Sequence, residues 1–164
     1  MELDETNKNN SDMLLQLVSF CIGDEEFVVD ILKVQEINRL VQITKVPNSP
    51  GFIEGVINLR GRIIPVVDLR VRLGMSKIKY GINTRIIVVE LNEETIGFIV
   101  DSVSEVLRIP KSITEPPPSI IAGIDAKYIT AIGKLEDRLL IMLDLEKILI
   151  ANGKEQLWQM APNE

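Results

Sequence analysis

Apolar residues along the chain gather in short runs separated by turn-forming residues, a pattern typical of β-strands rather than of long helices. In the first half, these runs predict strands at Leu14–Ile22, Glu26–Asp30, Lys33–Arg39, Gly55–Leu59 and Arg62–Val67. Asp68 is a favourable N-cap residue, so we expect a short helix at Leu69–Leu73 that ends at Gly74.

The second half of the chain shows the same kind of pattern. It predicts strands at Thr84–Leu91, Thr95–Val100, Val103–Ile109, Tyr128–Leu135 and Arg138–Leu143, and a helix at Leu145–Ala151 after Asp144. A proline-rich insertion, Lys111–Ile121, interrupts this half. Short strands at this spacing favour a small barrel over alternating strands and helices.

The second half also repeats the first. Residues 52–69 align without a gap with residues 128–145, and Phe27–Asp30 matches Phe98–Asp101. A period of this length is too long for a solenoid unit. Within residues 13–151 we therefore expect an all-β fold of two five-stranded SH3-like barrels with short helices, intertwined or side by side, divided at roughly 14–83 and 84–151. One such barrel would be marginally stable alone, so the two should share apolar surface.

Charge and composition narrow the possible functions. The net charge is −6, and the only dense basic cluster is Arg60, Arg62, Arg70 and Arg72, which argues against nucleic-acid binding. No apolar run approaches the length of a membrane span, and the N-terminus does not resemble a signal peptide, so we expect a cytoplasmic protein without membrane insertion. The tails, 1–12 and 152–164, are expected to be loose, and the first of them disordered.

Catalytic chemistry finds little support in the residue types present. The chain has no histidine and a single cysteine, Cys21, which removes the commonest general base and nearly excludes zinc and iron–sulfur sites. Asp30, Asp68, Asp101 and Asp144 occupy repeat-related positions, so we interpret them as caps or turn formers. We therefore predict no enzymatic activity, no catalytic or metal site and no cofactor.

Residues that break the repeat are better candidates for function. The turn containing Arg60 is replaced in the second copy by Lys134–Asp137, and the proline-rich insertion has no counterpart in the first copy. Arg60 is either a solvated turn residue or part of an interaction face, and the same alternatives hold for Glu36. Ile120 and Ile121 either project from the insertion or pack back into the core.

Several segments together resemble one known family. They are Phe27–Ile37, Pro47–Pro50, Phe52–Gly61 and Ile64–Leu69, within a match that covers roughly residues 14–151. These segments resemble the bacterial chemotaxis coupling proteins of the CheW family. The resemblance implies two five-stranded barrels and a non-enzymatic adaptor that couples the cytoplasmic tips of methyl-accepting chemoreceptors to the histidine kinase CheA in arrays beneath the inner membrane.

The resemblance also implies which residues meet each partner. The positions that match the family's receptor groove are Val34, Glu36, Arg60, Gly97, Val103 and Val106. The positions that match its kinase contact are Glu115 and Ile120, at the proline-rich insertion. Two alternatives stay open: a binding module of the same architecture in another kinase pathway, such as pilus motility, and a small-molecule sensor that uses the cleft between the barrels.

Overall fold

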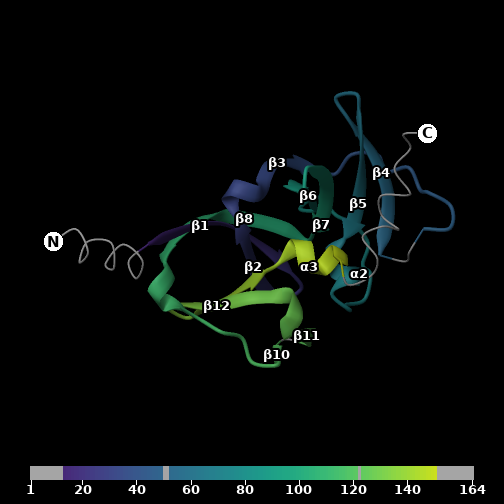
Figure 1. Cartoon of the computed structure of the whole chain (residues 1–164). Helices are drawn as coiled ribbons and strands as arrows, with labels where there is room; N and C mark the ends of the chain where they lie inside the picture. The colour runs from purple at the N-terminus through teal and green to yellow at the C-terminus, as the bar shows by residue number, and fades with distance from the viewer. Residues whose placement is uncertain (1–12, 50–51, 122, 151–164) are drawn as a thin grey trace.

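The computed structural model describes residues 13–49, 52–121 and 123–150, and at residue 150 it describes the backbone alone. The expectations for the two tails and for Ala151 lie outside the described residues. Within these residues, the chain forms short β-strands with two short α-helices and three 3₁₀ turns (Figure 1).

The elements follow the predicted order. The strands of the first half are β1 (Leu14–Ile22), β2 (Glu25–Asp30), β3 (Val34–Arg39), β4 (Ile53–Leu59) and β5 (Arg62–Asp68). Those of the second half are β6 (Arg85–Leu91), β7 (Glu94–Val100), β8 (Ser102–Pro110), β9 (Thr114–Glu115), β10 (Ile120–Ile121), β11 (Ile124–Asp125), β12 (Ile129–Leu135) and β13 (Arg138–Leu143). The helices are α2 (Leu69–Arg72) and α3 (Leu145–Ile150), and the 3₁₀ turns are Ile31–Lys33, Lys111–Ile113 and Ala126–Tyr128. The predicted strands and helices are confirmed, with small differences at their ends.

The strands form two main sheets, each of which contains strands from both halves of the chain. Sheet A has the order β8-β1-β2-β13-β12-β9, and sheet B has the order β3-β6-β7-β5-β4. Neighbouring strands are antiparallel except at two places, where β2 pairs with β13 and β5 pairs with β7 in parallel. In these parallel pairs Phe27 lies opposite Ile141, and Phe98 lies opposite Val67.

The two repeats have therefore exchanged their first hairpins. The β1–β2 hairpin joins strands of the second half in sheet A, and the β6–β7 hairpin joins strands of the first half in sheet B. The sheets have the intertwined arrangement, which is one of the two that we expected. A division of the chain between residues 83 and 84 does not separate the two sheets, because each sheet takes strands from both sides of it. The alignment shows which residues are equivalent, but it cannot show in which sheet each copy finds its pairing partners.

Alternate residues of the central strands enter different cores. Successive side chains of a strand point to opposite faces of its sheet. Leu17 therefore belongs to a core inside sheet A, whereas Val18 belongs to a larger core to which both sheets contribute. In sheet B, Ile86 faces an inner core and Ile87 faces the shared core. The prediction that the barrels share apolar surface is confirmed.

The four repeated aspartates have the structural role that the sequence predicts. Asp68 accepts a hydrogen bond from the Val71 amide at 3.3 Å, and Asp144 accepts one from the Lys147 amide at 3.1 Å, as N-caps of α2 and α3. Asp30 accepts the Leu32 amide at 2.9 Å, and Asp101 accepts the Gly23 amide at 2.8 Å. Each of these carboxylates thus accepts a hydrogen bond from a backbone amide.

A network of polar side chains ties four strands of sheet A together. The carboxylate of Glu26 on β2 accepts hydrogen bonds from the Ser19 hydroxyl on β1 and from Arg138 Nε on β13, the latter at 3.1 Å. Arg138 Nη2 also donates to Glu105 on β8 at 3.1 Å. Hydrogen bonding from Arg138, above all, lowers the pKa of Glu26 despite the opposing effect of burial, and Glu26 in turn raises the pKa of Arg138.

This network predicts a pH dependence of stability. A carboxylate whose pKa is lower in the folded chain stabilises it above the unfolded pKa, and this stabilisation is lost as the pH falls through the folded value. For Glu26 the loss begins below about pH 4.5, the ordinary value for a glutamate. The free energy of unfolding, measured by urea titration from pH 6 to pH 3, should therefore fall less steeply in Glu26→Gln than in the wild type. Glu94→Gln, at an exposed carboxylate on β7, should keep the wild-type slope; equal slopes for wild type and Glu26→Gln would contradict the assignment.

Candidate functional site

The turn between β4 and β5 places Arg60 at the tip of a projecting hairpin (Figure 1). Arg60 and Gly61 both have positive φ, 54° and 85°, and the Asn58 side chain accepts a hydrogen bond from the Gly61 amide at 2.9 Å. Two positive φ values in a two-residue loop match the twist of the flanking strands. Glycine or asparagine suits such a position better than arginine does, so turn geometry alone does not explain Arg60.

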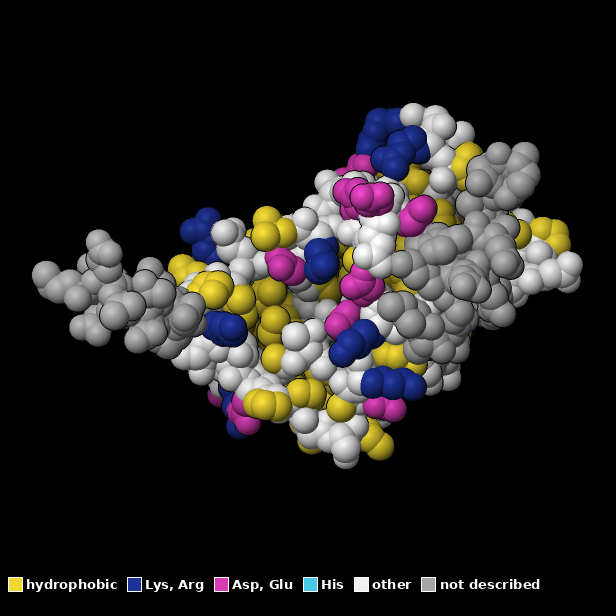
Figure 2. Space-filling view, viewed as in Figure 1, with side chains coloured by type: hydrophobic (Ala, Val, Ile, Leu, Met, Phe, Trp, Pro, Cys, Tyr) yellow, Lys and Arg dark blue, Asp and Glu magenta, His cyan; other side chains and the backbone are white. Residues whose placement is uncertain are grey.

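Arg60 pairs with Glu36 across the surface. Its Nη2 donates to the Glu36 carboxylate on β3, an edge strand of sheet B. The side chain of Arg60 is 70% exposed and that of Glu36 is 28% exposed, so water screens the pair. Exposed ion pairs contribute about 0–1 kcal/mol to stability. In Figure 2, basic side chains gather at the top of the molecule, where Figure 1 shows the projecting hairpin, and acidic side chains gather next to them.

The three predicted valines lie on the edge strands of the two sheets. Val34 begins β3 and Val103 lies near the start of β8, and both are half-buried against the shared core. Val106, further along β8, is 52% exposed. Because β3 and β8 are edge strands of different sheets, these valines bring apolar surface to the outside of the shared core from both barrels.

Gly97, which was also predicted to contact the receptor, is buried in β7 between Val66 and Val88 of the neighbouring strands. A Cβ at this position would lie 2.8 Å from Ile86 Cγ2 and 2.9 Å from Val66 Cγ1. Gly97 therefore offers little surface to a partner in this structure. Its lack of a side chain allows close packing inside sheet B.

The two residues predicted to contact the kinase lie on the proline-rich insertion. Ile120 on β10 is 66% exposed, whereas its neighbour Ile121 packs against the shared core. Of the two alternatives for this pair, Ile120 projects from the insertion and Ile121 packs back into the core. Glu115 on β9 is exposed and lies 3.5 Å from Lys134 Nζ. Figure 1 shows the β10–β11 hairpin on the opposite side of the molecule from the tip of the β4–β5 hairpin.

The arginines that cluster in the sequence have separate roles in the structure. Arg62 donates to the Thr95 hydroxyl at 2.8 Å, and Arg70 lies 3.3 Å from Asp101. Arg72 is buried, and its guanidinium carbon lies 5.1 Å from the ring centre of Phe52 and 5.2 Å from that of Tyr128. Sequence reasoning did not single out this contact, although Phe52 and Tyr128 are equivalent in the repeat.

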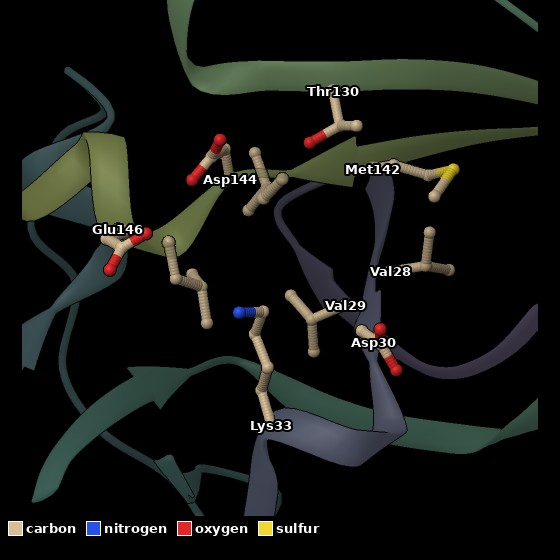
Figure 3. A pocket seen from close by; sticks show the side chains of 10 residues that line it. Val28, Val29, Asp30, Lys33, Thr130, Met142, Asp144 and Glu146 are labelled. Atoms are coloured by element: carbon tan, nitrogen blue, oxygen red, sulfur yellow. The ribbon is translucent and has the colours of Figure 1, made fainter. Parts of the chain in front are cut away.

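A hollow of about 250 Å³ lies between the 3₁₀ turn Ile31–Lys33 and the start of α3. Figure 3 shows the Lys33 ammonium directed into this hollow, while the carboxylates of Asp30, Asp144 and Glu146 point in different directions. Small-molecule sites are usually larger and have converging polar groups. In the described residues, no group of three or more histidine, cysteine or acidic side chains is placed to hold a metal ion. This hollow therefore lacks the usual features of a small-molecule site.

These features define a class: an intertwined two-barrel β protein whose candidate functional side chains lie on outer surfaces. Comparison with known proteins agrees, because residues 16–152 match the family model described as the CheW-like domain. The chemotaxis protein CheW of Klebsiella aerogenes is 41% identical over 134 residues, which are 82% of this chain and 81% of that protein. The chemotaxis protein CheW of Helicobacter pylori is 36% identical across 88% of this chain and 87% of that protein.

A solved structure agrees as well. The crystal structure of the scaffolding protein TtCheW from Thermoanaerobacter tengcongensis superposes with a TM-score of 0.79 at 41% identity, over 86% of this chain and 91% of that one. The chain therefore belongs to the CheW-like family and has the two SH3-like barrels of that fold. Family membership supports a role as a chemotaxis scaffold or adaptor. None of the helices in the described part of the chain has the length and apolar character of a membrane span.

The packing around Gly97 generates a prediction. Gly97→Ala should destabilise the protein by about 1–3 kcal/mol, because the added methyl group would overpack the core of sheet B. Gly133→Ala is the matched control, since its Cβ would lie 3.4 Å from the nearest heavy atom, Ile109 Cδ1, and should cost less. Urea unfolding measures both variants. A Gly97→Ala protein with wild-type stability and lost receptor binding would contradict the packing role.

Proposed function

We propose that this protein is a non-enzymatic adaptor that couples the cytoplasmic tips of methyl-accepting chemoreceptors to the histidine kinase CheA in signalling arrays beneath the inner membrane. Membership in the CheW-like family supports this proposal, and so do the chemotaxis names of the matched relatives. The acidic net charge of −6 is consistent with protein rather than nucleic-acid partners.

The proposed receptor surface consists of Val34, Glu36, Arg60, Val103 and Val106. Its half-buried valines and the exposed Val106 could contact the apolar turns of an amphipathic helix. Binding of this kind, in which a helix lies in an apolar groove, is a common mode of peptide recognition. The Glu36–Arg60 pair would set the register of that helix, because charged groups at an interface determine specificity more than affinity.

The observation that carries the receptor proposal is the Glu36–Arg60 pair. It is exposed, contributes little to stability, and depends on an arginine at a turn position that favours smaller residues. The repeat-related turn of the second barrel has Glu136 at the same position, with φ 55°, so the fold accepts other side chains there. The pair is therefore better explained by recognition than by folding.

The proposed kinase surface is the β10–β11 hairpin, with Ile120 as the apolar contact and Glu115 as a charge at its rim. Ile121 and Ile124 anchor the hairpin in the shared core, so that Ile120 is presented on a fixed base. The two proposed surfaces lie on different sides of the molecule, which allows both partners to bind at once (Figure 1).

Co-sedimentation of the purified chain with a receptor-tip fragment and a kinase fragment tests the proposal. The chain should bind each fragment alone, and it should bring the two into one complex when both are present. Binding to neither fragment would overturn the proposal. Binding to a kinase from another pathway, and not to CheA, would place the chain in that pathway instead.

Reversal of the charge at Glu36 should separate the two interactions. Glu36→Lys places two positive charges together at Arg60 and should weaken receptor binding by about tenfold, while thermal stability and kinase binding stay near wild type. Glu136→Lys, a charge reversal at the position equivalent to Arg60, is the control and should leave receptor binding unchanged. An unfolded Glu36→Lys protein would show that Glu36 is structural.

Ile120→Asp should have the opposite effect. A carboxylate at the centre of an apolar contact must lose its water, so kinase binding should weaken by about tenfold or more, with receptor binding unchanged. Ile82→Asp is the control, because Ile82 is 91% exposed in the connector between α2 and β6. Isothermal titration with each fragment measures both variants. Unchanged kinase affinity in Ile120→Asp would move the kinase surface elsewhere.

A further inference from the structure

Repeat-related residues meet around Arg72. Phe52 and Tyr128 occupy the same position in the two repeats, and their carbonyl groups accept matching hydrogen bonds from Asp68 N at 2.9 Å and from Asp144 N at 2.8 Å. The central carbon of the Arg72 guanidinium lies over both rings, 5.1 Å from the ring centre of Phe52 and 5.2 Å from that of Tyr128. We call Phe52, Arg72 and Tyr128 the aromatic clamp.

Burial of the charged Arg72 side chain costs free energy. Arg72 is 9% exposed, and no ion pair among the described residues involves it. Its Nη2 donates to the Tyr128 hydroxyl at 3.3 Å, and its Nε has no hydrogen-bond partner within the described part of the chain. A buried charge without a carboxylate partner is usually destabilising, and stacking on aromatic rings offsets only part of that effect.

The second repeat shows that the fold does not require an arginine here. Asp68 and Asp144 are equivalent in the repeat, so the position equivalent to Arg72 is Ile148. Ile148 is fully buried in the shared core. An apolar side chain is therefore sufficient at this position of the second copy, and the arginine of the first copy calls for another explanation.

Arg72 links two parts of the chain that are far apart in sequence. It ends α2, which directly follows β5 of the first repeat. Tyr128 ends the 3₁₀ turn Ala126–Tyr128, which directly follows β11. That turn also holds the base of the β10–β11 hairpin, because the Ala126 amide donates to the Ser119 carbonyl at 3.0 Å. The clamp thus joins the first repeat to the base of the hairpin that presents Ile120.

We propose that Arg72 is a positioning residue that holds Tyr128 and thereby fixes the β10–β11 hairpin in the orientation that binds the kinase. This inference rests on the proposed function. Ile121 and Ile124 hold the hairpin against the shared core by apolar packing. A guanidinium that lies over two rings and donates to a hydroxyl adds a directional contact at the base of the hairpin. A hairpin ordered before binding loses less entropy when it docks.

Arg72→Met tests the proposal, because methionine keeps much of the apolar volume and removes the charge and the donor. Its melting temperature should equal or exceed that of the wild type, and its receptor affinity should stay within about twofold, while its kinase affinity should fall by about tenfold. Tyr128→Phe removes only the hydroxyl and should weaken kinase binding less than Arg72→Met does. Arg72→Lys keeps the charge over the rings and should restore part of the affinity. Ile148→Met, at the equivalent position, is the matched control and should leave both affinities unchanged.

Amide hydrogen exchange of the two strands of the hairpin, Ile120–Ile121 and Ile124–Asp125, tests the positioning without any partner. Exchange should be several-fold faster in Arg72→Met than in the wild type, since a less ordered hairpin opens more often. Unchanged exchange, unchanged kinase affinity, or a parallel loss of both affinities with a lower melting temperature would each overturn the proposal. A wild-type chain that binds neither fragment, with faster hairpin exchange in Arg72→Met, would overturn the proposed function and leave the positioning role in place.

Discussion

The parallel pairing of β2 with β13 and of β5 with β7 is the constraint on which the rest of the structure depends. Each pair joins a hairpin of one repeat to strands of the other, so neither sheet can be completed from one half of the chain. The central strands are covered on both faces, which directs alternate residues such as Leu17 and Val18 into separate cores. One shared core then stabilises both barrels, and the connections between them stay short.

The same exchange positions the residues of the proposed surfaces. It leaves β3 and β8 as edge strands of different sheets, so Val34 and Val103 pack against the same shared core although they come from opposite repeats. The aromatic clamp also combines the two repeats, because Arg72 contacts two equivalent aromatic residues, Phe52 of the first repeat and Tyr128 of the second. A duplicated fold that has exchanged its hairpins therefore creates sites that neither copy contains alone, and residues that differ between the copies distinguish one surface from the other.

Much of the local structure could be predicted from the sequence. Strand alternation, the capping residues Asp68 and Asp144, and the tight turn at Arg60–Gly61 depend on neighbours in the chain, and the structure contains all of them. Part of the candidate site could also be predicted from the sequence, since Glu36 and Arg60, which were both singled out, form an ion pair. Gly97 was predicted to lie on a partner surface but is buried. The sequence could not decide between the two, because a glycine in a strand allows either the close approach of a partner or close packing within the core.

By itself, the sequence determined the longer strands and the two helices, the internal duplication and the family, because these follow from local periodicity and from equivalent residues. It did not predict the short strands β9, β10 and β11 or the 3₁₀ turns. Only the tertiary structure decided which hairpin completes which sheet, which of Ile120 and Ile121 is exposed, and how the four arginines between residues 60 and 72 separate into different environments. The physical reason is that these outcomes depend on contacts between residues far apart in the chain. A pattern of neighbouring residues specifies the face of a strand, but it does not specify the partner that covers that face.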